Sequence, residues 1–92
     1  MNKVTFAVSG ESTNSRAQAA SLARKAIEGG KAVVVIHVCG DTAQGCTYAA
    51  VYLHSDGHVC VMVPDGSSVV DLRDVFTLDT ALRVAHGWIL AD

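Results

Sequence analysis

The chain has 92 residues, of which 50% are hydrophobic and 17% are charged, and its mean hydropathy is +0.32. This composition excludes a disordered chain, and the length favours one domain spanning residues 1–92. No apolar run approaches the roughly 18 residues of a membrane span, and a net charge of −2 offers no basic surface for nucleic acid. We therefore expect a globular protein that binds neither membranes nor nucleic acids.

Cysteine usage favours a reducing compartment. Cys39, Cys46 and Cys60 are an odd number of cysteines, which argues against a disulfide framework. The first residues, Met1 to Val8, show no signal-peptide pattern. We therefore expect a cytoplasmic protein.

Charge is divided unevenly along the chain. Residues 1–31 carry five Lys and Arg against two Glu, whereas residues 32–92 carry two Arg against seven Asp. This asymmetry results from a basic first helix and acidic turns, or it orients a partner electrostatically.

The N-terminal part predicts a strand followed by a helix. Residues 3–9 alternate apolar and polar side chains, as a half-buried strand does, and 10–14 form a polar break. Ser15 and Gln18 fit a capping box, with Asn14 as an alternative cap. The helix that follows has an apolar stripe consisting of Ala19, Leu22, Ala23, Ala26 and Ile27. Gly29 and Gly30 supply its left-handed stop.

The remainder predicts three more strands and a final helix. The strands are 32–39, 46–54 and 58–63, with 69–72 as a possible short edge strand. Thr77 begins a helix whose apolar stripe consists of Leu78, Ala81, Leu82, Ala85, Trp88 and Ile89. The predicted fold is α+β in the order β-α-β-β-β-α: a four-stranded, mostly antiparallel sheet with two helices packed on one face. The first strand lies parallel to 32–39 through a right-handed crossover, or at an edge.

The loop between the last two long strands determines which side chains share a face. With a three-residue loop, Ser55 to Gly57, and a left-handed Gly57, His54 lies opposite His58. One face is then purely aliphatic and the other amphipathic. A two-residue turn would mix the two faces, so we favour the longer loop.

The amphipathic face is the predicted functional surface, because two helices on one side leave it uncovered. Its residues are Val33, Val35, His37, Tyr48, Ala50, Tyr52, His54, His58, Cys60 and Met62. A soluble monomer rarely exposes so large an apolar patch, and covering it would contribute on the order of 10 kcal/mol before association costs. A twofold homodimer through this face is the central hypothesis. The alternative is that residues 66–74 fold across it.

Metal binding and catalysis have less support in the sequence. His37-Val38-Cys39 and His58-Val59-Cys60 are identical triplets that offer zinc-like ligands. In a meander they lie roughly 10 Å apart, too far for one ion. A site from His37, Cys39 and Cys46 lacks a fourth ligand. No catalytic signature accompanies any cysteine, so we expect no metal, no cofactor and no catalytic residues.

Residues 48–89 carry a pattern that resembles HicB-type antitoxins. The matching pieces are Ser55-Asp56-Gly57, Val63-Pro64-Asp65 and Thr77-Leu78-Asp79-Thr80-Ala81-Leu82. The resemblance covers less than half of the chain, the family's Pro-Gly-Cys turn is missing, and residues 3–28 have no place in its order. It implies a non-catalytic oligomer that binds and blocks another protein.

Together these patterns predict a non-enzymatic, protein-binding homodimer. Its role would be that of an inhibitor or antitoxin-like accessory factor, encoded by a phage or other mobile element, with an unidentified protein partner. The alternative is a small-molecule or metal-binding module, with its site on the sheet face lined by His, Tyr and Cys. A third possibility is an enzyme that uses Cys39, Cys46 or Cys60.

Overall fold

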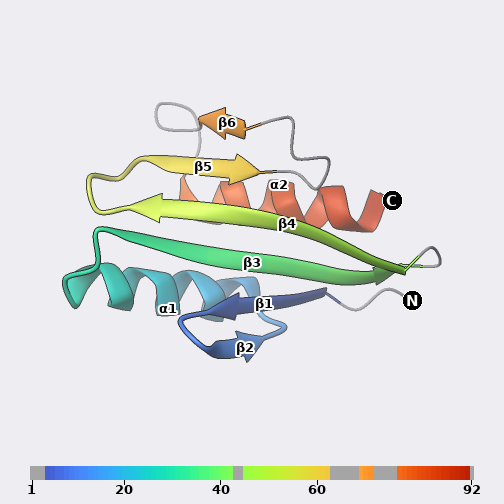
Figure 1. Ribbon diagram of the computed structural model, residues 1–92, viewed down its shortest axis with the longest axis horizontal. Helices are drawn as coiled ribbons and strands as arrows, with labels where there is room; N and C mark the ends of the chain where they lie inside the picture. The colour runs from blue at the N-terminus through green and yellow to red at the C-terminus, as the bar shows by residue number, and fades with distance from the viewer. Residues whose placement is uncertain (1–3, 43–44, 63–68, 72–76, 92) are drawn as a thin grey trace.

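The computed structural model describes residues 4–42, 45–62, 69–71 and 77–91 (Figure 1). Within these residues the elements are β1 (Val4–Val8), β2 (Glu11–Thr13), α1 (Arg16–Glu28), β3 (Val33–Thr42), β4 (Gly45–His54), β5 (Val59–Met62), β6 (Val69–Asp71) and α2 (Leu78–Ala91). The strands form one antiparallel sheet in the order β2-β1-β3-β4-β5-β6. Neither helix of the described part of the chain has the length and apolar character that crossing a bilayer requires.

The predicted α+β fold is confirmed, and the sheet is wider than expected. The short edge strand predicted at 69–72 is β6, which pairs with β5. The prediction of a polar break at 10–14 is wrong, because residues 11–13 form β2. Ser9 and Gly10 both have positive φ, 51° and 84°, as a two-residue hairpin turn of the primed type requires. The chain therefore reverses before the first helix begins.

This extra hairpin also decides the direction of β1. The strand lies inside the sheet, between β2 and β3, and pairs antiparallel with β3, so Phe6 lies opposite Val38. The sequence left two placements of the first strand open, parallel to β3 or at the edge of the sheet, and both are wrong. Because β2 reverses the chain once, α1 starts near the end of the sheet at which β1 begins. The helix then carries the chain to the other end, and β3 runs antiparallel to β1. Without β2, the same helix would have made a parallel crossover.

Helix α1 begins and ends as its sequence predicts. The Ser15 hydroxyl accepts a hydrogen bond from the Gln18 backbone N–H at 3.2 Å, so Ser15 is the N-cap. Asn14 is not the cap, because its side-chain amide donates to the Val4 carbonyl at 2.8 Å and ties the helix start to β1. At the other end, Gly30 has φ 109° and the Lys31 N–H donates to the Ala26 carbonyl, a Schellman arrangement.

The hydrophobic core lies between the helices and one face of the sheet (Figure 1). Helix α1 covers β1 and β3, and α2 covers β3, β4 and β5. The largest fully buried side chains are Phe6, Ile36, Leu82, Ile89, Val8, Val38 and Val51. The predicted stripe of α2 is buried except for Trp88, which is 37% exposed. Trp88 lies on the exposed side of α2, whereas the next residue, Ile89, is fully buried, so placing Trp88 in the core was wrong.

The predicted register of the β4–β5 hairpin is confirmed. Leu53 pairs with Val59, and the His54 N–H donates to the His58 carbonyl at 2.9 Å. Gly57 has φ 94°, the left-handed conformation that the three-residue loop requires. The aliphatic residues assigned to the covered face are therefore buried where the structure describes them, except Ala32, which precedes β3 and is exposed.

Two glycine substitutions test these backbone assignments. A Cβ at Gly57 or at Gly87 would meet nothing within 4 Å, so only backbone conformation decides the effect. We expect Gly57→Ala to lower the free energy of unfolding by about 1 kcal/mol, because alanine disfavours positive φ. Gly87 lies inside α2, where alanine is the better helix former. Gly87→Ala should therefore raise the free energy of unfolding by about 0.5–1 kcal/mol. Urea unfolding monitored by circular dichroism measures both, and equal effects would contradict the assigned loop.

Candidate functional site: the uncovered face of the sheet

The side of the sheet opposite the helices is the candidate site. Figure 1 looks onto this side, with both helices behind the strands. Strand pairing places nine of the predicted residues on this side: Val33, Val35, His37, Tyr48, Ala50, Tyr52, His54, Cys60 and Met62. The tenth, His58, precedes β5 and lies on the same side, with its ring stacked on His54. Their residue neighbours along each strand are the buried ones that face the helices. We call this surface the open face.

Most side chains of the open face are only partly covered, and they cover one another. Val33 is 42% exposed, although it is a large aliphatic residue. Ala50 is fully buried but lies outside the core, because its small side chain is flanked by His37 on β3 and Met62 on β5. The alternative prediction was that residues 66–74 fold across this face. Of these residues the structure describes only β6. That strand extends the sheet at its edge.

A histidine and a tyrosine interact at the middle of the open face. His37 Nδ1 and the Tyr48 hydroxyl are 2.9 Å apart, and their ring centroids are 5.7 Å apart. Burial raises the pKa of the Tyr48 phenol above its ordinary value, and the neighbouring Tyr52 and Cys39 contribute. The face therefore favours an uncharged Tyr48.

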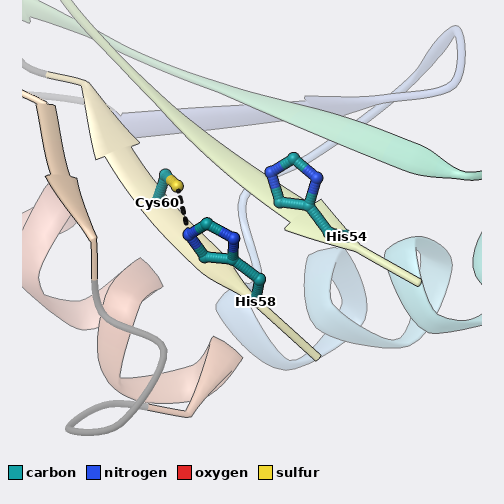
Figure 2. A group of neighbouring side chains, drawn as sticks. All are labelled: His54, His58 and Cys60. Carbon is teal, nitrogen blue, oxygen red and sulfur yellow. Dashed lines mark hydrogen bonds between the residues drawn. The ribbon is translucent and has the colours of Figure 1, made fainter. Parts of the chain in front are cut away.

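A second cluster lies at the end of the open face, around the β4–β5 hairpin (Figure 2). Cys60 Sγ and His58 Nε2 are 3.0 Å apart and hydrogen-bonded. The His54 ring stacks on the His58 ring across the two strands, with centroids 4.8 Å apart. In the loop, Asp56 Oδ1 accepts a hydrogen bond from the His58 backbone N–H at 2.9 Å, which supports the turn. Two imidazoles and a thiol thus meet at one point.

The two His-Val-Cys triplets are not brought together. Strand β4 separates β3 from β5, so His37 and Cys39 lie on the far side of β4 from His58 and Cys60. Cys39 pairs instead with Tyr48. The side chain of Cys46 lies outside the described residues. The prediction that the two triplets lie too far apart to share one metal ion is therefore confirmed.

Sequence reasoning missed the grouping of His54 with His58 and Cys60. The signal for it was present in the predicted hairpin register, which already placed His54 opposite His58 and Cys60 two residues further along the same face. The repeated His-Val-Cys triplet instead pairs residues that β4 separates.

The helical side of the molecule is polar by comparison. Arg24 and Asp79 form an exposed ion pair at 3.3 Å between the two helices. Nearby, a cavity of about 190 Å³ is lined by Arg16, Ala17, Asp79 and Arg83. His86 packs edge-on against Phe6, with centroids 5.8 Å apart, and its pKa is lowered by burial and by Arg16. His86 is thus a packing residue.

Comparison with known proteins found no matching family model, no matching curated protein and no matching solved structure. The resemblance to HicB-type antitoxins therefore stays a prediction.

The ionisation of Tyr48 tests the environment of the open face. Because the pKa is raised on folding, the neutral phenol stabilises the fold below pH ~10, and this contribution is lost as the pH rises through the raised value. We expect Tyr48 in a Tyr52→Phe variant to ionise at higher pH when folded than in urea, measured by tyrosinate absorbance. Burial is the larger cause and remains in the variant. Coincident titrations in both states would show that Tyr48 is not desolvated.

Proposed function

We propose that this chain is a non-enzymatic, protein-binding protein that pairs through its open face with the same face of a second copy. The observation that carries the proposal is the charge pattern. Among residues of the open face whose side chains the structure describes, none is Asp, Glu, Lys or Arg. Interface centres are similarly depleted of charge and enriched in Tyr and Met.

The opposite surface of the molecule shows the contrast. Charged side chains are exposed along the outer sides of both helices: Arg16, Arg24, Lys25, Glu28, Asp79 and Arg83. A surface left in water carries charge of this kind. The helical side therefore carries exposed charges beside the exposed Val84 and Trp88, whereas the described side chains of the open face carry no charge.

A second copy is the occupant that best fits the open face. The molecule measures 39 × 25 × 18 Å, and the open face spans its two longer dimensions. Such a face is about as large as the ~800 Å² that each partner buries in a standard interface. The described side chains of the open face carry no charge that would repel a copy of itself, and two sheets can pack about 10 Å apart by interleaving their side chains. The result is a closed twofold dimer.

In this arrangement the helical surface remains available for a further protein partner. Three basic residues of α1, Arg16, Arg24 and Lys25, are exposed there. They suit a partner with an acidic surface, because complementary charge speeds and orients association. We infer an accessory role in the cytoplasm, of an inhibitor or antitoxin-like kind, such as small proteins of mobile elements perform.

A matched pair of substitutions tests the dimer. Val33 on the open face and Val84 on α2 are 42% and 45% exposed in the single chain, so glutamate should cost each site a similar amount of folding stability. We expect the wild-type protein to sediment at about twice 9.6 kDa at micromolar concentration. Val33→Glu should weaken the dimer at least tenfold, because it buries an unpaired charge. Val84→Glu should leave the dimer intact.

The proposal fails if the wild-type protein is a monomer throughout the micromolar range. It also fails if Val84→Glu dissociates the dimer and Val33→Glu does not, because the interface would then be on the helices.

A further inference from the structure

Three potential metal ligands converge at the β4–β5 hairpin. His54 ends β4, while His58 and Cys60 lie one and three residues beyond Gly57, and all three point to the open face (Figure 2). One ligand atom from each residue, two imidazole nitrogens and the sulfur, lie within 4.8 Å of one another. His54 is brought to His58 and Cys60 by the β4–β5 hairpin, because it lies on the other strand.

The spacing is close to that of a filled site. Zinc binds nitrogen at about 2.0–2.1 Å and sulfur at about 2.3 Å, so tetrahedral N and S ligands lie roughly 3.5 Å apart. Cys60 Sγ and His58 Nε2 are already 3.0 Å apart and must separate only slightly. The His54 ring, now stacked on His58, has to turn its nitrogen toward the same point.

We propose that His54, His58 and Cys60 bind a single zinc ion. Two imidazoles and one thiolate are a typical zinc ligand set, and three protein ligands leave a fourth position open. Binding replaces the proton shared between Cys60 and His58: the thiol loses it to solvent, and both atoms then donate electron pairs to the ion. No oxidation or reduction is involved.

The hairpin holds the ligands in place before the ion arrives. The His54–His58 backbone hydrogen bond fixes the two histidines opposite each other. The Asp56 carboxylate and the left-handed Gly57 stabilise the loop between them. All three ligands are half-buried in the single chain, so an ion can enter from solvent before a second copy covers the open face. This site goes beyond the proposed dimer, since one hairpin of one chain supplies every ligand.

The test is titration of the metal-free, reduced protein with Zn²⁺ and with Co²⁺, the latter as a spectroscopic substitute. We expect one equivalent per chain and a thiolate-to-Co²⁺ charge-transfer band. Losing a group that only supports a ligand already costs about 10- to 100-fold in metal affinity. Cys60→Ser, His54→Gln and His58→Gln should therefore each weaken Zn²⁺ binding at least tenfold.

Matched controls lie on the same face but outside the hairpin. Cys39→Ser and His37→Gln should keep wild-type Zn²⁺ affinity. Zn²⁺ should also protect Cys60, and not Cys39, from alkylation in the wild-type protein. This measurement needs no variant, so it remains decisive if a ligand substitution prevents folding. Repeating the Zn²⁺ titration on the wild-type protein at concentrations at which it is monomeric and at which it is dimeric separates the metal site from the dimer, and we expect unchanged stoichiometry.

Three results would overturn the zinc site. The first is a Co²⁺ complex without a thiolate band. The second is Cys60→Ser binding Zn²⁺ as tightly as the wild type. The third is Cu⁺ occupying the cluster in the presence of excess Zn²⁺, which would assign the ligands to a softer ion.

Discussion

The structure depends on one constraint: a sheet has two faces, and both helices of the described chain cover the same one. Alternation along each strand sends every second side chain to the helices and the others away from them. In β3, β4 and β5 both sets are largely apolar, so the sequence supplies two hydrophobic surfaces and one layer of helices. Among the residues that the structure describes, no further helix or strand lies over the second surface. The open face is therefore a direct consequence of strand periodicity and of where the helices pack.

The β4–β5 hairpin controls what that face contains. A loop one residue shorter would place Cys60 opposite Leu53 and would move His58, Cys60 and Met62 to the covered side, because the side-chain period of a strand is two. Gly57, with its positive φ, allows the longer loop. The same loop brings His54 against His58 and leaves Cys60 beside them. One backbone feature thus determines both the composition of the broad face and the cluster at its end.

The two proposals concern different parts of this surface and rest on different chemistry. Pairing of two copies rests on the broad, uncharged area around Val35 and Tyr52, where burial of apolar surface would drive association. Zinc binding rests on three donor atoms at one edge of that area. The charged helical side faces away from both. A molecule divided in this way can associate through one side and present the other to a partner of opposite charge.

The sequence alone determined most of the local structure. The alternation of residues 33–39 and 48–62, the Ser15 cap and the Gly57 loop are encoded by neighbours in the chain, and each was predictable from them. Only the tertiary structure decided the rest. The three-residue β2 is too short to show a period, yet its single chain reversal makes β1 antiparallel to β3. The grouping of His54, His58 and Cys60 likewise depends on side-chain positions across two strands. Local sequence patterns specify the side-chain period of a strand and the type of a turn. The direction of a strand depends on how many times the chain has reversed before it, and contacts between strands depend on their register.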